Sequence, residues 1–258
     1  MLAAMLLAAC GDDDGGGAGA GDAPKVTPTP REVTVISTIP ALSPTPATGG
    51  GRASDERVAF QTEDGVVIRG HVYTAPGPQR RAVIFAHMFT DDQRSWQPFA
   101  RELAASGVAT LTFDFRGYGE TGGSRDVSRI DRDLAAAVLF LKSRDYPLIY
   151  LVGASMGGTA ALKVAASQEV AGVVAVSAPV SFMGLSAQSD VTRVTERKAF
   201  LASRNDPEGA AQALQQFMQL APEPKESFLF EGSAHGTALL QGATAGPFKA
   251  WISEFVQR

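Results

Sequence analysis

The chain has 258 residues, 45% of them hydrophobic, a length and composition that suit one globular domain with a sizeable core. The formal net charge of −4 carries no basic excess, which argues against a nucleic-acid-binding surface with clustered lysine and arginine. No stretch of the sequence reaches the roughly 20 apolar residues that a membrane-spanning helix needs.

The single cysteine, Cys10, ends a short stretch rich in alanine and leucine and allows no intrachain disulfide. Leu7-Ala8-Ala9-Cys10 resembles the lipobox of bacterial lipoproteins, in which the cysteine is acylated and becomes the mature N-terminus. No lysine or arginine precedes the apolar stretch, unlike in an export signal, and the alternative is an incidental cysteine. The resemblance implies a lipoprotein signal over residues 1–10. It also implies a cell-envelope location, with the chain lipid-anchored to a bacterial membrane at Cys10 and facing outside the cytoplasm.

Residues 11–54 are rich in Gly, Asp, Pro and Thr, and include three consecutive aspartates at 12–14 and three glycines at 49–51. Glycine and aspartate cannot build a core, and repeated proline favours extended conformations. The sequence therefore predicts a disordered tether over residues 11–54 and a folded domain over residues 55–258.

From residue 55 onward, short apolar runs alternate with segments of helical periodicity. Two strands are predicted at 58–62 and 66–73, joined by a turn at 63–65 that makes them antiparallel. Further strands are predicted at 82–87, 108–113, 148–152, 172–176, 198–202 and 227–230. Helices are predicted at 96–106, 128–144 with Ser128 as N-cap, 156–167, 208–220 and 248–256. This alternation predicts an α/β fold, a mostly parallel sheet of about eight strands with helices on both faces.

Three polar residues directly follow strands of this predicted sheet. Ser155 follows the strand at 148–152, Asp206 the strand at 198–202, and His235 the strand at 227–230. The carboxyl ends of parallel strands are where open α/β sheets place their chemistry. Gly153-Ala154-Ser155-Met156-Gly157 fits the G-x-S-x-G nucleophile elbow, whose glycines permit a tight turn between strand and helix.

These motifs and their order resemble the α/β-hydrolase family, in particular serine esterases and dienelactone hydrolases, from residue 58 to the C-terminus. The resemblance implies that Ser155 is the nucleophile, that His235 transfers the proton and that Asp206 orients His235. It also implies an oxyanion hole formed by the backbone N–H groups of Met156 and Phe89, with Met88 as second choice for Phe89.

The implied activity is hydrolysis of carboxylic esters, with short-chain or exogenous acyl substrates, through an acyl-enzyme and without metal or cofactor. A small-molecule ester is the expected partner, together with a membrane but no nucleic acid. Dienelactone-hydrolase-like or prolyl-oligopeptidase-like activity remains within this class. The alternatives are a serine peptidase or amidase, a thioesterase, and a non-catalytic envelope domain that uses the same fold for binding.

Each assigned residue also has a simpler interpretation. Ser155 fits a plain loop serine and His235 an ordinary surface histidine. Asp206 fits the N-cap of a helix that begins at Pro207, in which case Asp190 or Glu208 would be the substitute acid.

A second glycine-rich motif, Gly117-Tyr118-Gly119-Glu120-Thr121-Gly122, matches the G-x-G-x-x-G pattern of dinucleotide sites. It does not lie in the first strand-to-helix turn, and the next predicted helix begins only at Ser128. The same stretch, from Asp114, resembles the structural Asp-x-Arg-Gly-x-Gly loop of α/β-hydrolases. No pattern of metal-ligand spacing is present in the sequence.

The segment between the strands at 172–176 and 198–202 has room for a loop and one short helix, such as 183–193, so we expect an open site without a cap domain. No charged residue points clearly at a charged substrate. The residues that either line the site or belong to the core are Pro179, Val180, Phe182, Met183, Phe89 and Trp96.

Overall fold

The computed structural model describes residues 54–258. The predicted signal, Cys10 and all but the last residue of the predicted tether lie outside the described residues. That last residue, Ser54, is the first residue of strand β1. Within the described part of the chain, no helix combines the length and apolar character needed to cross a membrane.

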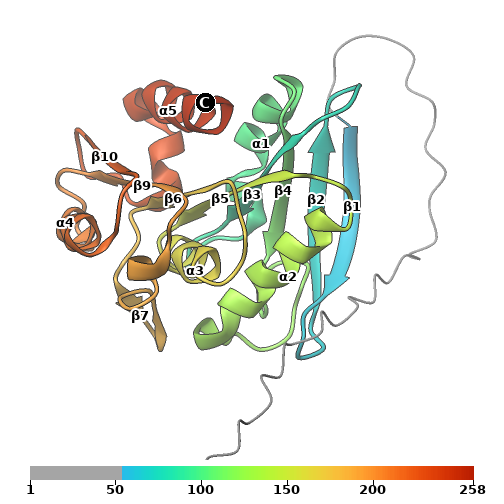
Figure 1. Cartoon of the computed structure of the whole chain (residues 1–258), viewed down its shortest axis with the longest axis horizontal. Helices are drawn as coiled ribbons and strands as arrows, with labels where there is room; N and C mark the ends of the chain where they lie inside the picture. Colours follow the sequence, from blue (N-terminus) through green and yellow to red (C-terminus); the bar gives the residue numbers. More distant parts are fainter. Residues whose placement is uncertain (1–53) are drawn as a thin grey trace, which may run out of the picture. The chain divides into compact units, whose positions relative to one another are not determined.

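The fold is built on an eight-stranded sheet with strand order β1-β2-β4-β3-β5-β6-β9-β10 (Figure 1). β1 pairs antiparallel with β2 and β2 antiparallel with β4, whereas all the other neighbours are parallel. The predicted fold class and the antiparallel opening pair are thus confirmed. The strands are β1 (Ser54–Gln61), β2 (Val67–Thr74), β3 (Arg81–Ala86), β4 (Ala109–Asp114), β5 (Leu148–Ala154), β6 (Gly172–Val176), β9 (Arg197–Ser203) and β10 (Lys225–Phe230).

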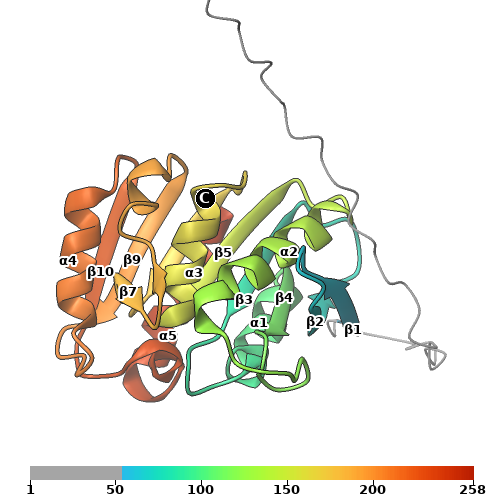
Figure 2. The same ribbon diagram turned by 90° about the horizontal axis from the view of Figure 1, so that it is seen from below.

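Helices cover both faces of the sheet, as expected. α2 (Ile130–Lys142), α3 (Met156–Ala165) and α4 (Ala210–Leu220) lie on one face, and α1 (Gln97–Ala105) and α5 (Ala245–Gln257) lie on the other (Figures 1 and 2). Two separate clusters of buried apolar side chains result, one under each helical layer. The central strands are apolar over nearly their whole length because both of their faces are covered.

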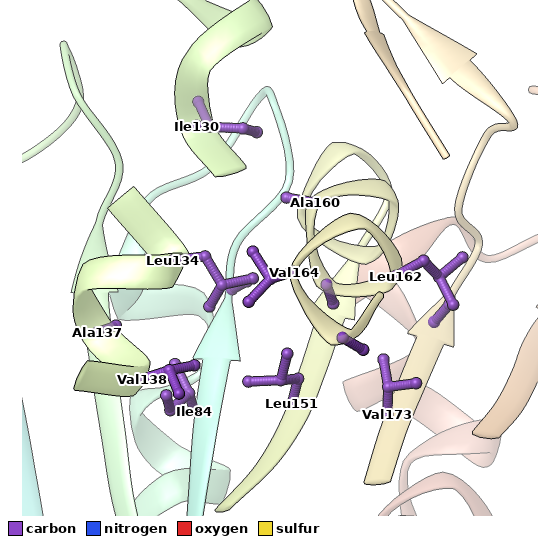
Figure 3. Packing of buried hydrophobic residues seen from close by; sticks show 14 of the residues in the cluster. Ile84, Ile130, Leu134, Ala137, Val138, Leu151, Ala160, Leu162, Val164 and Val173 are labelled. Carbon is purple, nitrogen blue, oxygen red and sulfur yellow. The ribbon is translucent and has the colours of Figure 1, made fainter. Parts of the chain in front are cut away.

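The larger cluster holds α3, the helix that directly follows Ser155, against the sheet. Leu134 and Val138 of α2 and Val164 of α3 pack over Ile84 of β3 and Leu151 of β5 (Figure 3). All five are buried, and their apolar stripe fixes α3 directly over the centre of the sheet. The N-terminus of α3 therefore meets the carboxyl end of β5 in a tight connection.

Three helix starts differ from the sequence prediction by two or three residues. The last helix, predicted from residue 248, begins earlier, at Ala245. The other two begin later than predicted. Ser128 is not an N-cap: it lies in a 3-10 turn (Val127–Arg129), its Oγ hydrogen-bonds Asp126 at 2.6 Å, and α2 begins at Ile130. The predicted helix at 208–220 begins at Ala210, after Gly209 in the left-handed conformation. In both of these cases a hydrogen-bonded turn in the backbone precedes the first residue of the helix.

The predicted helix at 183–193 was wrong. The segment forms a small hairpin of β7 (Ser181–Phe182) and β8 (Leu185–Ser186), followed by a 3-10 turn at Val191–Arg193. Met183 and Gly184 form its two-residue turn with φ values of 46° and 86°. Two successive positive φ values are what a type I′ hairpin turn requires, and they break a helix. Within residues 54–258, no cap domain is inserted between β6 and β9.

Candidate active site

Ser155 lies in the sharp connection between β5 and α3. Its backbone has φ 50° and ψ −120°, a conformation that residues other than glycine rarely adopt. Its N–H donates to Val176 O of the neighbouring strand at 2.8 Å, which fixes the turn against β6. Positive φ in a residue other than glycine is costly and persists only where the surrounding structure enforces it. The strained turn holds Ser155 at the carboxyl edge of the sheet.

The glycines on either side of Ser155 are required by space. A Cβ at Gly153 would lie 2.2 Å from Gly157 O, and a Cβ at Gly157 would lie 2.6 Å from both Ala86 O and His87 O. The strand, the helix and the loop after β3 therefore approach each other at backbone distance. This confirms the steric reason for the two outer glycines of the G-x-S-x-G pattern.

Asp206 and His235 come together at the ends of β9 and β10. His235 Nδ1 lies 3.0 Å from Asp206 Oδ1 and 2.9 Å from Asp206 Oδ2. The Asp206 carboxylate can only accept, so Nδ1 carries the proton and Nε2 is left as an acceptor. Asp206 Oδ1 also accepts from the Glu208 N–H, but α4 starts later, so Asp206 is not the N-cap of that helix. Both oxygens of this buried carboxylate face the imidazole.

His235 Nε2 is shielded from solvent and makes no hydrogen bond with any described residue. The Glu208 carboxylate lies 3.3 Å from it and is largely exposed. Burial by itself lowers the pKa of His235, but the hydrogen bond and charge of Asp206, with the charge of Glu208, outweigh it and raise the pKa above 6.5. His235 thus has Nδ1 held by Asp206, while Nε2 makes no hydrogen bond and has the Glu208 carboxylate as a charged neighbour.

The loop that carries His235 packs against the turn that carries Ser155. A Cβ placed at Gly236 would lie 3.5 Å from Ala154 Cβ and 2.7 Å from Met88 Sδ, so the residue after His235 contacts the residue before Ser155. Thr237 Oγ1 donates to Asp91 Oδ2 at 2.5 Å, which ties this loop to the loop after β3. Ser155 and His235 make no hydrogen bond with each other in this structure.

The loop after β3 contains the second predicted oxyanion donor. His87 is buried, with Nδ1 2.8 Å from Met88 O, and its Nε2 accepts from the Phe115 N–H at 3.1 Å. Both ring nitrogens are therefore occupied, and burial lowers the pKa of His87 and keeps it neutral. The N–H groups of Met88 and Phe89 make no hydrogen bond within residues 54–258, so both choices for the donor stay open. The N–H of Met156, the first residue of α3, has no acceptor within its helix.

The glycine-rich stretch after β4 is not the start of a helix, because α2 begins only at Ile130. Asp114 accepts from the Gln93 side chain and from the Glu120 N–H. Arg116 is buried and forms ion pairs with Asp133 at 2.6 Å and Asp64 at 2.8 Å. These side chains use their polar atoms inside the protein and fasten the loop to the sheet and to α2. Within residues 54–258 no group of three or more potential ligand side chains is placed to hold a metal ion.

The residues expected to line the site divide into two sets. Trp96 does not line it: the indole is fully buried against Phe85 and Phe248, and Nε1 donates to Ala86 O at 3.1 Å. Phe89 and Phe182 meet edge to face, with their ring centroids 5.4 Å apart, and are only partly buried. Met183, at the tip of the hairpin, is 62% exposed. Pro179 and Val180, which lead into the hairpin, are partly buried.

The two substitute acids do not replace Asp206. Asp190 pairs with Arg193 and lies 3.6 Å from Lys163 of α3. Glu208 approaches His235, but at the nitrogen opposite to the one that Asp206 holds. This contact of Glu208 was missed by the sequence reasoning, and so was Arg125, whose guanidinium lies near Phe89. Neither contact carries a sequence signal, since each depends on how distant loops pack.

The fold and the strand-end arrangement together define an α/β-hydrolase type of protein. The family model described as the Alpha/beta hydrolase family matches residues 83–255. The chain belongs to this family.

Curated relatives match only part of the chain. The thiohydrolase aneE of Aspergillus aculeatus is 35% identical over 115 residues, which are 41% of this chain and 35% of that protein. The 2-succinyl-6-hydroxy-2,4-cyclohexadiene-1-carboxylate synthase of Salmonella paratyphi B is 32% identical over 133 residues, 49% of this chain and 48% of that protein. The chain thus spans less than half the length of these two relatives.

Solved structures resemble a larger share of the chain. An esterase from Pyrococcus furiosus has a TM-score of 0.70 at 20% sequence identity, covering 80% of this chain and 93% of its own. A dienelactone hydrolase from Anabaena variabilis has a TM-score of 0.68 at 19% sequence identity, and the similarity covers 80% of this chain and 98% of that one. At these identities the similarity establishes the shared fold.

Proposed function

We propose that this protein is a serine hydrolase that cleaves carboxylic esters with Ser155, His235 and Asp206 as its catalytic triad. The observation that carries the proposal is the pairing of His235 Nδ1 with both oxygens of Asp206 while Nε2 has no hydrogen-bond partner. The loop of this imidazole contacts Ala154, beside a serine held in a strained turn. A base with one fixed nitrogen, on a loop packed beside a buried serine at the carboxyl edge of the sheet, is the arrangement that nucleophilic acyl transfer requires.

In the proposed reaction Ser155 Oγ attacks the ester carbonyl carbon, and its proton passes to His235 Nε2. The N–H groups of Met156 and Phe89, or of Met88 in place of Phe89, hold the oxyanion. Breaking the ester C–O bond releases the alkoxide, which takes the proton back from His235. Water then attacks the acyl-enzyme with the same histidine as base, and the acid is released. Asp206 keeps the imidazole in the required tautomer and stabilises its protonated form.

The proposed substrates are esters with short acyl chains, or exogenous esters that need an open site. In support, the segment between β6 and β9 is a hairpin and a single turn rather than a cap. Phe89 and Phe182 offer an apolar surface that is not fully enclosed. A series of p-nitrophenyl esters of increasing chain length tests this, and a preference for long chains would contradict it.

Labelling by a fluorophosphonate probe tests the triad proposal. We expect the wild-type protein to be labelled, Ser155→Ala to be unlabelled, and Ser233→Ala, which alters an exposed serine two residues before His235, to be labelled as wild type. A folded wild-type protein that takes no label would favour the alternative of a non-catalytic binding domain. Amide substrates run in parallel distinguish a peptidase or amidase.

Thioester hydrolysis is a second candidate, favoured by the similarity to a protein named a thiohydrolase. The same triad chemistry applies, with a thiolate as the leaving group. Comparing kcat/KM for an acetyl ester and the matched acetyl thioester separates the two. A preference for the thioester beyond its greater intrinsic reactivity would replace ester hydrolysis as the proposed activity.

We also propose, from the sequence alone, that Cys10 carries a lipid that anchors the chain to a bacterial membrane and that residues 11–54 tether the catalytic domain outside the cytoplasm. Two or more acyl chains give stable anchoring, whereas one chain binds reversibly. Expression of the full chain and of Cys10→Ser, followed by membrane fractionation and labelling with a palmitate analogue, tests the anchor. Unchanged partitioning and absence of label in the wild type would contradict it.

A further inference from the structure

The rim of the site beside Phe89 carries a cation, Arg125, in the loop between β4 and α2. Its guanidinium carbon lies 4.2 Å from the ring centre of Tyr118 and 5.7 Å from that of Phe89. Within residues 54–258 it forms no ion pair, and its one hydrogen bond is from Nε to Gly117 O at 3.4 Å. The neighbouring acid Asp126 is engaged by Ser128 and Arg129 instead.

The two rings under Arg125 connect it to the reacting centre. Tyr118 is buried, and its hydroxyl lies 3.9 Å from the thioether of Met156, the residue after the nucleophile. Phe89 is the proposed second oxyanion donor. Arg125 therefore lies over the side chain of Phe89 and one aromatic ring away from the side chain of Met156, the two residues whose N–H groups are the proposed oxyanion donors. Its exposed guanidinium can be reached by a substrate that lies along Phe89.

The position of this cation is built into the loop. A Cβ at Gly117 would lie 2.3 Å from the backbone nitrogen of Arg125, so the two stretches of the loop pack backbone to backbone. Stacking on Tyr118 restricts the side chain further, because a guanidinium over an aromatic face is held by electrostatic attraction to the ring. Apart from the Nε bond to Gly117 O, the N–H groups of Arg125 make no hydrogen bond within residues 54–258, and the N–H edge of a guanidinium matches a carboxylate.

The two sides of the candidate site carry side chains of opposite charge. On the His235 side lies the carboxylate of Glu208, 3.3 Å from Nε2. On the Phe89 side lies Arg125, without a carboxylate partner among the described residues. We infer that Arg125 recognises an anionic group, specifically a carboxylate, on the ester substrate, several bonds away from the reacting carbonyl. This inference rests on the proposed ester hydrolysis and names the substrate class for it.

The test uses matched pairs of esters that differ only in charge. Mono-4-nitrophenyl suberate carries a free carboxylate at the far end of its acyl chain, and methyl 4-nitrophenyl suberate carries a neutral ester there. The measured quantity is the ratio of kcat/KM for the anionic ester to that for the neutral ester. The full chain is used throughout, at low salt, where screening of the exposed cation is weakest.

We expect Arg125→Met to lower this ratio about five- to tenfold, through KM for the anionic ester, since it removes one partly exposed charged contact. Arg125→Lys keeps the charge but not the planar fork, so it retains part of the ratio. The matched control is Arg144→Met in the turn that follows α2, where the guanidinium lies 4.7 Å from the Phe140 ring centre and pairs with Glu56. This control leaves the ratio unchanged.

The possible results distinguish failure of the Arg125 inference from failure of the proposed ester hydrolysis. If the wild type hydrolyses both esters and Arg125→Met leaves the ratio unchanged, the inference is overturned while the proposed function stands. If the ratio falls equally in Arg144→Met, general charge rather than recognition explains it, and the inference is again overturned. If the wild type hydrolyses neither ester and takes no fluorophosphonate, the proposed function fails and the inference fails with it.

Discussion

Two histidines follow strands at the same edge of the sheet, His87 after β3 and His235 after β10. His87 is buried with both ring nitrogens hydrogen-bonded, and burial lowers its pKa. His235 has one nitrogen held by Asp206 and the other without a hydrogen bond, and its pKa is raised. The same side chain is therefore a neutral structural link in one loop, and in the other it has the free nitrogen that the proposed role of base requires. The partners, more than the residue type, decide which role is open to it.

The largest expected effect comes from removing the base. His235→Ala should lower kcat for p-nitrophenyl butyrate by about 10⁴-fold, because it removes the imidazole proposed to take the serine proton. Asp206→Asn should cost a similar factor, since an amide can hold the imidazole in the wrong tautomer. The control is His71→Ala, which alters the remaining histidine, on β2 and paired with Asp55. Retained hydrolysis in His235→Ala would contradict the assignment.

For His87 the expected effect is on stability. His87→Leu leaves the buried Phe115 N–H without its acceptor and removes one of the two donors to Met88 C=O, which keeps the Asp91 N–H, so we expect a loss of about 1–3 kcal/mol in the free energy of unfolding. Urea unfolding followed by tryptophan fluorescence measures it. If His87→Leu were as stable as wild type but inactive, His87 rather than His235 would be the functional histidine.

The pH profile sharpens the comparison further. The base must be neutral to accept a proton, and the pKa of His235 is raised above 6.5 by Asp206 and Glu208 against the opposing effect of burial. Activity is therefore lost as the pH falls through this raised value, so the acid limb of kcat/KM should lie above pH 6.5. An acid limb clearly below pH 6.5 would indicate another base or a different environment for the imidazole.

The smallest expected effect concerns Glu208. Its carboxylate favours the protonated form of His235 from 3.3 Å, so Glu208→Gln should move the acid limb to lower pH. The shift should be modest and should shrink at high salt, because Glu208 is largely exposed. Glu231→Gln, which removes an exposed carboxylate paired with Arg204, is the matched control and should leave the limb in place. Equal shifts in both variants would show that the effect comes from overall charge.

Much of the fold could be predicted because its strands are short apolar runs. Residues 148–152 and 172–176 are covered on both faces, so their sequences contain little that fits anything except a buried strand. The order of Ser155, Asp206 and His235 along the chain could also be predicted, since each follows a short apolar run, although the run before His235 is a partly exposed edge strand. The hairpin at 181–186 was missed because its strands have two residues each and leave no periodicity to detect.

The details of the site were less accessible from sequence. Asp206 could be placed at a strand end, but only the structure distinguishes a helix cap from a partner of His235. The position of Arg125 over Phe89 joins two loops far apart in the chain. Such contacts arise from packing between loops rather than from a local pattern, so propensity and periodicity carry no trace of them.

The central claim is that Ser155 forms a covalent bond with the acyl group of the substrate. Rapid acid quenching of the protein during turnover of p-nitrophenyl butyrate, followed by peptide mass spectrometry, tests this directly. The account predicts a butyryl group on the peptide that contains Ser155, and none in Ser155→Ala. Turnover with no acylated peptide, or with the acyl group on another residue, would contradict it.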